Sequence, residues 1–62
     1  MPLPRALIVE DVDEFVLMAT TVLEAEGFEV HAAGTAAAGI DSARRLDPDL
    51  VILDITLPDG LG

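Results

Sequence analysis

Three carboxylates in this 62-residue chain stand directly after two continuous apolar runs. Glu10 and Asp11 follow the run at residues 6–9, and Asp54 follows the run at residues 50–53. Carboxylate oxygens favour Mg²⁺, Mn²⁺ or Ca²⁺ as ligands, and an open site with few protein ligands favours Mg²⁺. A carboxylate beside such a cation can attack a phosphoryl group, because the cation neutralises charge on the incoming phosphate. Asp54 is therefore a candidate phosphoryl acceptor, provided that the fold brings the three residues together.

Two simpler interpretations use the same residues. Aspartate often caps a turn, and a stretch containing Pro and Gly follows Asp54 at residues 57–60. Alternatively, the three acidic residues stand at separate loop ends and have no joint role. The arrangement of the strands decides between these interpretations and a shared site.

The pattern of apolar residues predicts three strands separated by two helices. Residues 6–9 and 50–53 are wholly aliphatic, which is typical of strands buried on both faces, whereas residues 28–32 alternate like an edge strand. Apolar residues at steps of three and four predict helices over residues 13–26 and 35–46. The order is therefore β-α-β-α-β, which indicates an α/β fold in a single small unit.

This order of elements predicts where the three carboxylates meet. Crossovers between parallel strands are right-handed, and an edge-like second strand gives a three-stranded parallel sheet in the order 2-1-3. The first and third strands are then neighbours, about 4.8 Å apart, with their carboxyl ends at one edge. Glu10, Asp11 and Asp54 are expected to share a pocket at the point where the connections change direction.

The sequence also predicts how the helices begin, end and face the sheet. Asp13 is the expected N-cap of the first helix, and Gly27 is the expected glycine after its end. The predicted apolar stripe of this helix consists of Phe15, Ala19, Val22 and Leu23. Thr35 is the expected cap of the second helix, whose predicted inner stripe consists of Ala36, Gly39, Ile40, Ala43 and Leu46.

Composition restricts the partners and the compartment. The formal net charge is −9, with three arginines and no lysine, so this segment is not expected to bind nucleic acid or an anionic membrane. No apolar run approaches the length that spans a bilayer, and the amino terminus has no signal-peptide pattern. The absence of cysteine fits a reducing compartment. The sequence therefore predicts a soluble, cytoplasmic protein.

Several stretches together resemble the receiver domain of two-component response regulators. They are residues 6–11 (ALIVED), 27–30 (GFEV), 48–50 (PDL) and 50–60 (LVILDITLPDG), and the similarity extends from about residue 5 to residue 62. The acidic pair, the strand-end aspartate and the turn after it carry the resemblance as a set. The resemblance implies a non-enzymatic signalling module with a flavodoxin-like fold.

The resemblance also implies a role for each residue of the site. Asp54 would be phosphorylated by a partner histidine kinase. Asp11 would bind Mg²⁺ directly, Glu10 would take part through water, and Thr56 would contribute its backbone carbonyl. Pro58 and Gly60 match the turn that shapes the loop after the active-site strand.

The chain departs from the family pattern in its extent. The flavodoxin-like fold has five strands in the order 2-1-3-4-5. Residues 1–62 are expected to form a partial receiver domain, with the first three strands and the first two helices. The family's later Ser/Thr, switch aromatic and strand-end Lys have no counterpart in this sequence, so signalling by this segment alone is not expected. Its third strand would form an exposed apolar edge, which predicts self-association into a homodimer or a larger assembly.

Two alternative functions remain open from the sequence. One is a self-associating structural half-domain without phosphotransfer activity. The other is an enzyme of the haloacid-dehalogenase type, which also uses a strand-end aspartate nucleophile. The sequence typical of that family is Asp-x-Asp after the strand. This chain has Thr56 two residues after Asp54, so its resemblance to that family is poor.

Overall fold

The computed structural model describes residues 2–54. The elements in chain order are β1 (Arg5–Val9), α1 (Asp13–Ala25), β2 (Glu29–Ala33), α2 (Ala36–Leu46) and β3 (Leu50–Leu53). All pairings are parallel, and the sheet order is β2-β1-β3. The predicted α/β architecture, a truncated flavodoxin-like β-α-β-α-β chain with strand order 2-1-3, is confirmed.

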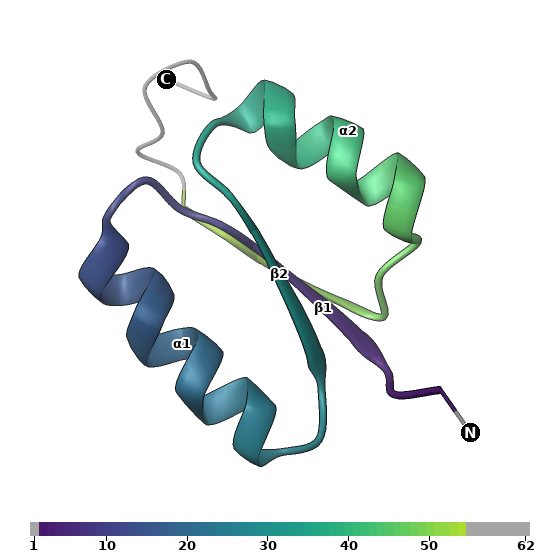
Figure 1. Cartoon of the computed structure of the whole chain (residues 1–62). Helices are drawn as coiled ribbons and strands as arrows, with labels where there is room; N and C mark the ends of the chain where they lie inside the picture. The colour runs from purple at the N-terminus through teal and green to yellow at the C-terminus, as the bar shows by residue number, and fades with distance from the viewer. Residues whose placement is uncertain (1, 55–62) are drawn as a thin grey trace.

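Strand β1 is the centre of a three-layer arrangement. Helix α1 covers one face of the sheet and α2 covers the other, and both pack over β1 and β2 (Figure 1). Side chains alternate along β1: Leu7 and Val9 enter the core beneath α2, whereas Ala6 and Ile8 enter the core beneath α1. All four are at most 3% exposed. Among residues 2–54, neither helix has the length and apolar character needed to cross a membrane.

Helix α1 differs from the sequence prediction at its start. The cap residue is Val12, with φ −91° and ψ 111°, and its carbonyl accepts from the N–H of Val16 at 3.1 Å. Asp13, the predicted cap, is the first helical residue, and no side chain caps this end. The N–H of Val12 is bonded to the carboxylate of Glu10. Val12 thus carries both the backbone contact to Glu10 and the first carbonyl that accepts a hydrogen bond in α1. Gly27 follows the helix with φ 93°, as predicted for a glycine in that position.

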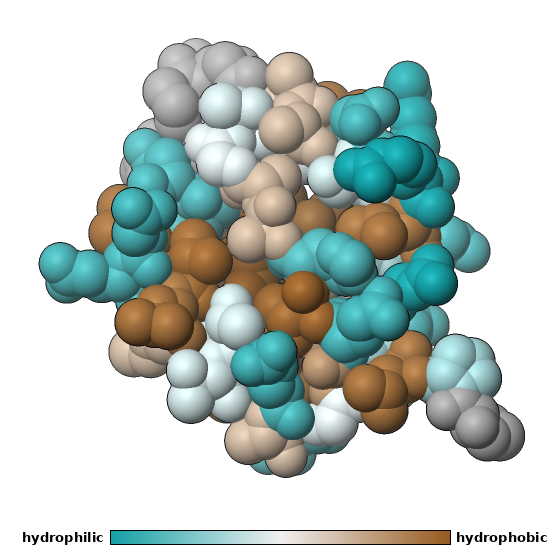
Figure 2. Space-filling model, in the orientation of Figure 1, coloured by the Kyte–Doolittle hydropathy of each residue, from teal (hydrophilic) through white to brown (hydrophobic). Residues whose placement is uncertain are grey.

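The sheet-facing stripe of α1 contains Ala19 and Leu23, as predicted, but Val16 takes the place predicted for Phe15. Leu23 is buried, and Val16 and Ala19 pack beside it against β1. Phe15 and Val22, which were predicted to face inward, are 40% and 58% exposed. Leu17 and Met18 on α1 are also exposed, and apolar side chains interrupt the hydrophilic surface on the side where α1 lies (Figure 2).

Helix α2 lies close to the sheet because small residues face it. Thr35 accepts from the N–H of Ala38 at 3.1 Å, which confirms the predicted cap. A Cβ atom added to Gly39 would stand 2.8 Å from both methyl carbons of Val9, so any other residue requires the Val9 side chain to shift. Ile40, predicted to lie in the inner stripe, is 56% exposed at the margin of the helix.

Strand β3 is the least covered part of the sheet. The aliphatic run predicted burial on both faces, but Val51 and Leu53 are 48% and 49% exposed. Only β1 lies beside β3 among residues 2–54, and both helices pack over the other two strands. The predicted exposed edge at β3 is therefore present in this part of the chain.

Candidate functional site

Backbone hydrogen bonds fix the chain where the two neighbouring strands end. The N–H of Glu10, directly after β1, donates to the carbonyl of Ala33 in β2 at 2.9 Å. The N–H of Asp54, directly after β3, donates to the carbonyl of Val9 in β1, also at 2.9 Å. Because the strands are parallel and adjacent, these bonds hold both residues at the carboxyl edge of the sheet.

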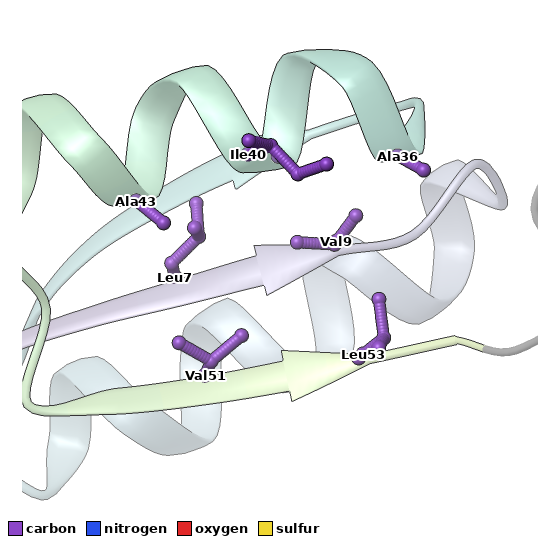
Figure 3. A pocket seen from close by; sticks show the side chains of 8 residues that line it. Leu7, Val9, Ala36, Ile40, Ala43, Val51 and Leu53 are labelled. Atoms are coloured by element: carbon purple, nitrogen blue, oxygen red, sulfur yellow. The ribbon is translucent and has the colours of Figure 1, made fainter. Parts of the chain in front are cut away.

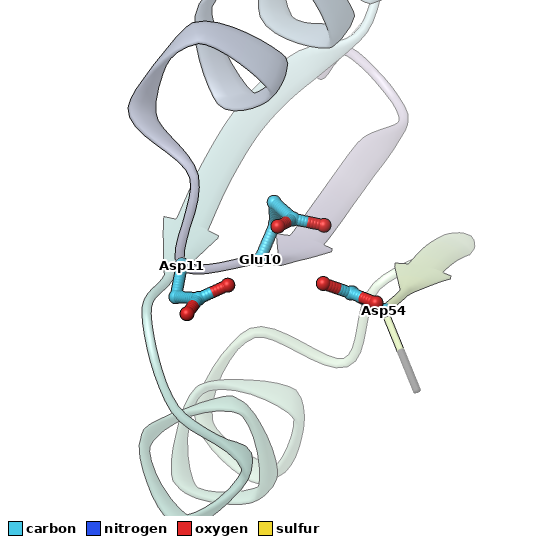
Figure 4. A group of neighbouring side chains, drawn as sticks. All are labelled: Glu10, Asp11 and Asp54. Carbon is cyan, nitrogen blue, oxygen red and sulfur yellow. The ribbon is translucent and has the colours of Figure 1, made fainter. Parts of the chain in front are cut away.

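Three predicted site residues converge at this edge. Each of Glu10, Asp11 and Asp54 offers a carboxylate oxygen, and the three oxygens lie within 4.8 Å of one another. The carboxylates face a common space, with Asp11 on the loop after β1 and Asp54 opposite it (Figure 4). Glu10 is buried, Asp54 is half-buried and Asp11 is exposed. Thr56, Pro58 and Gly60 lie outside the described residues.

The environment of Glu10 disfavours its negative charge. Glu10 is only 8% exposed, and this burial raises the pKa of its carboxyl group above the usual value. The neighbouring carboxyls of Asp54 and Asp11 raise this pKa further, whereas the hydrogen bond from the N–H of Val12 lowers it. That N–H donates to Glu10 Oε1 at 3.1 Å and fixes the orientation of the carboxylate.

The donor set fits a hard divalent cation. All of its atoms are carboxylate oxygens, which Mg²⁺, Mn²⁺ and Ca²⁺ prefer, and neither a thiol nor an imidazole takes part. The three carboxylates repel one another when ionised, and a cation bound at this edge would offset that repulsion. Among residues 2–54, this is the one group of three potential metal ligands so arranged.

Sequence reasoning missed the part played by Val12. Its side chain has no chemistry that would suggest a site, because its contribution is a backbone N–H aimed at Glu10. His31 takes no part in the acidic cluster: its Nε2 atom lies 2.7 Å from Oε2 of Glu29, the first residue of β2, at the end of that strand away from the cluster.

Residues 6–62 match the family described as the response regulator receiver domain. This match covers most of the sequence, including all three carboxylates. The chain belongs to the response regulator receiver domain family. The resemblance noted in the sequence is thus confirmed, and the acidic cluster lies at the carboxyl edge of a receiver domain.

Two relatives illustrate the contexts in which similar receiver sequences occur. The chain is 44% identical over 64 residues to the aerobic respiration control sensor protein ArcB of Escherichia coli K12, in an alignment covering 100% of this chain and 8% of that protein. It is 41% identical over 54 residues to the DNA-binding response regulator MtrA of Mycolicibacterium smegmatis, covering 87% of this chain and 24% of that protein. The chain therefore spans a small part of the length of either relative.

Proposed function

We propose that this receiver module accepts a phosphoryl group on Asp54 from a histidine kinase. The observation that supports the proposal is the position of Asp54 at the end of β3, with two further carboxylates within 4.8 Å. Receiver domains are generally phosphorylated by histidine kinases, which gives the class of partner. The identity of the kinase and the output of the signal depend on the whole protein.

The proposed reaction is a transfer between two side chains. A carboxylate oxygen of Asp54 attacks the phosphorus, so that a new O–P bond forms while the P–N bond of the phosphohistidine breaks. The electron pair of that bond returns to the imidazole of the kinase, which takes up a proton. The receiver is consumed stoichiometrically as an acceptor, so we class it as a signalling module and not as an enzyme.

We also propose that Asp11 and Asp54 hold Mg²⁺ directly, with Glu10 acting through water and Thr56 through its carbonyl. When bound, Mg²⁺ would supply positive charge between Asp54 and the phosphoryl oxygens. Glu10 is suited to a supporting role, because it is buried and its carboxylate is held by the N–H of Val12. Asp11 is exposed on the loop and remains accessible from solvent.

Phosphorylation by a small-molecule donor tests the proposal without the unknown kinase. The chain is incubated with an acyl phosphate or a phosphoramidate in the presence of MgCl₂, and intact mass spectrometry reports the addition of one phosphoryl group. We expect the adduct in the wild-type chain and none in Asp54→Asn. Asp49→Asn is the matched control, because Asp49 lies at the other end of β3 and bonds to the backbone of Arg5.

The control also defines the contradicting results. An adduct of equal yield in Asp54→Asn would place the acceptor elsewhere, and loss of the adduct in Asp49→Asn would point to unfolding as the cause. Removal of Mg²⁺ with EDTA should suppress the adduct in the wild-type chain. An unchanged yield in EDTA would contradict the proposed metal ligands.

A second candidate function is self-association of the 62-residue chain as a structural unit. The supporting observation is the uncovered strand β3, with Val51 and Leu53 about half exposed at the edge of the sheet. Light scattering with and without Mg²⁺ and a phosphoryl donor measures it. A dimer indifferent to both additions would favour the structural function, whereas a monomer under every condition would exclude it.

We propose a cytoplasmic location for this module and no nucleic-acid contact by this segment. The net charge of −9 supports the latter, because binding to phosphate backbones depends on clusters of Lys and Arg. A shift assay with duplex DNA and with RNA should show no complex at physiological salt, and a salt-sensitive complex would contradict this expectation.

A further inference from the structure

We infer that Val12 is a positioning residue whose backbone N–H sets the cation preference of the acidic cluster of Glu10, Asp11 and Asp54. By holding one oxygen of Glu10, this N–H leaves the carboxylate able to serve a hydrated Mg²⁺ but unable to offer both oxygens to Ca²⁺. The inference deepens the cation site proposed above and rests on it. It adds a residue outside the cluster that determines which divalent cation the cluster selects.

The backbone of Glu10 is fixed where β1 ends. Its N–H donates to the carbonyl of Ala33 in β2 at 2.9 Å. Val9, the residue before it, is 3% exposed and points from β1 toward α2 (Figure 3). The freedom left to Glu10 therefore lies in its side chain, whose flexible stem allows the carboxylate to take several orientations.

The N–H of Val12 removes much of that freedom by donating to Glu10 Oε1 at 3.1 Å. The donor is itself held in place, because the carbonyl of the same residue accepts from the N–H of Val16 at 3.1 Å and Val16 packs against the core beside β1. Val12 is 52% exposed, so its contribution to the site comes from its backbone. The hydrogen bond thus ties the Glu10 carboxylate to the packed start of α1.

The two oxygens of the Glu10 carboxylate are therefore not equivalent. Oε1 accepts from a backbone donor, and the positive end of that N–H repels a cation that approaches the same oxygen. Oε2 is the oxygen left for a cation or for a water bound to it. Glu10 lies between Asp11 and Asp54, whose carboxylates face the same space (Figure 4). This arrangement favours ligation through one oxygen of Glu10 and disfavours ligation through both.

Divalent cations differ in what they require from a carboxylate. Mg²⁺ keeps several of its waters and takes few protein ligands, so one oxygen that accepts from a bound water is sufficient. Ca²⁺ takes about six to eight oxygen ligands and often uses both oxygens of a carboxylate. Because Oε1 is engaged by Val12, Glu10 cannot complete such a shell without breaking its hydrogen bond. The arrangement therefore favours Mg²⁺ over Ca²⁺, and the preference depends on Val12.

Deletion of the N–H tests the inference while every side chain is kept. A chain of 62 residues is accessible to chemical synthesis, and an ester in place of the peptide bond between Asp11 and Val12 removes this donor. Amide chemical shifts in NMR titrations with MgCl₂ and with CaCl₂ give the two dissociation constants. The ester should weaken Mg²⁺ binding about tenfold, as the loss of a group that orients a metal ligand commonly does. Ca²⁺ binding should weaken less, because the freed carboxylate can offer both oxygens, so the ratio of Mg²⁺ to Ca²⁺ affinity should fall severalfold.

A second ester is the matched control. An ester between Phe15 and Val16 deletes the N–H that donates to the carbonyl of Val12 and leaves the contact with Glu10 in place. Each ester removes one backbone hydrogen bond near the start of α1, so both should lower the midpoint of thermal unfolding in EDTA. Only the ester at Val12 should change the ratio of Mg²⁺ to Ca²⁺ affinity, which a purely structural role would leave unchanged.

Val12→Pro provides an independent deletion in the expressed protein. Proline lacks the N–H, and its φ of about −65° is near the φ of −91° at Val12. This variant should reproduce the fall in the affinity ratio. An unchanged ratio in both the Val12 ester and Val12→Pro would overturn the inference, and so would an equal fall in the control ester.

The wild-type results separate this inference from the proposals above. A chain that binds Mg²⁺ and accepts a phosphoryl group, with an affinity ratio insensitive to Val12, would overturn the inference alone. A wild-type chain that prefers Ca²⁺ would also overturn it, without bearing on Asp54 as the phosphoryl acceptor. A wild-type chain that binds neither cation would overturn the proposed metal ligands and this inference with them.

Discussion

The acidic side chains at the two ends of the parallel sheet have different neighbours: Arg5 at the amino end, and one another at the carboxyl end. At the amino end, Arg5 Nε lies 3.2 Å from Glu29 Oε2, and the backbone N–H of Arg5 donates to Asp49 Oδ2 at 2.9 Å. At the carboxyl end, the carboxylates of the acidic cluster face one another within 4.8 Å. The first arrangement stabilises the fold, whereas the second concentrates negative charge where a cation and a phosphoryl group would be bound.

The pKa values of two glutamates, Glu29 at the amino end and Glu10 at the carboxyl end, shift in opposite directions. The hydrogen bond to His31 lowers the pKa of Glu29 below its usual value, and Arg5 contributes in the same direction. Burial raises the pKa of Glu10, and the neighbouring aspartates add to that rise. The same side chain is thus favoured as an anion at one end of the sheet and disfavoured at the other. This crowding of carboxyl groups at the carboxyl end fits the cation site proposed above.

The largest expected effect concerns cation binding at the carboxyl end. Asp11→Asn removes one carboxylate of the cluster and should weaken Mg²⁺ binding at least tenfold, which corresponds to about 1.4 kcal/mol. Asp49→Asn removes the same charge from the amino end and should leave the affinity nearly unchanged. Isothermal titration calorimetry measures both. Equal losses in the two variants would show that net charge, and not the cluster, attracts the cation.

The amino end should show its role in stability. Arg5→Ala breaks the ion pair with Glu29 and the hydrogen bond from Arg5 Nη1 to the carbonyl of Leu46, which measures 2.9 Å. We expect a loss of about 1 kcal/mol in the free energy of unfolding, since these contacts are partly exposed. Arg45→Ala is the matched control.

Arg45→Ala removes an ion pair on the exposed surface of α2. Arg45 pairs with Asp41 across one helical turn, and both side chains are more than two-thirds exposed (67% and 77%). Its removal should cost no more than about 0.5 kcal/mol. Urea denaturation of the three proteins provides the comparison, and a larger loss for Arg45→Ala would contradict the stabilising role assigned to the amino end.

A smaller effect should appear at the carboxyl end without metal. Asp11→Asn relieves repulsion within the cluster and should raise the free energy of unfolding by about 0.5 kcal/mol in EDTA. At saturating Mg²⁺ the order should reverse, because binding to the folded state stabilises the wild-type chain more strongly. Thermal denaturation under the two conditions measures the reversal. A variant less stable than wild type in EDTA would show that Asp11 has a structural role.

The smallest expected effect is a pH dependence at the amino end. Because the pKa of Glu29 is lowered by folding, its contribution is present above the unfolded value of about 4.5 and is lost as pH falls through the folded value. His31→Ala removes the main cause of this shift and should make the loss of stability below pH 4.5 shallower. Glu26→Gln on the exposed end of α1 controls for a change in charge. An unchanged acid limb in His31→Ala would contradict the proposed role of the pair.

The local pattern of the sequence predicted much of the fold and the central geometry of the site. Each aliphatic run predicted a strand from consecutive residues alone. Gly27 adopts a positive φ after α1, and Thr35 accepts a hydrogen bond three residues along, so both could be predicted from the nearby sequence. The convergence of the acidic cluster followed from strand order, because parallel neighbouring strands must end at the same edge.

The sequence could not predict which part of a broad apolar surface the fold would cover. Val16 faces the sheet where Phe15 was expected, because the position of α1 over β1 and β2 depends on packing between segments. Nor does any side-chain pattern at residue 12 indicate that the N–H of Val12 donates to Glu10 while its carbonyl begins α1.

The sequence by itself determined the order of the elements, the parallel sheet and the presence of carboxylates at its carboxyl edge. These features arise from hydrophobic periodicity and chain connectivity, which are properties of short segments. Only the tertiary structure decided that Arg5 would bridge β2, α2 and the start of β3. Likewise, it decided that Gly39 would lie against Val9 and that Phe15 and Val22 would stay exposed. These outcomes depend on contacts between residues distant in the chain, and such contacts exist only once the layers have packed.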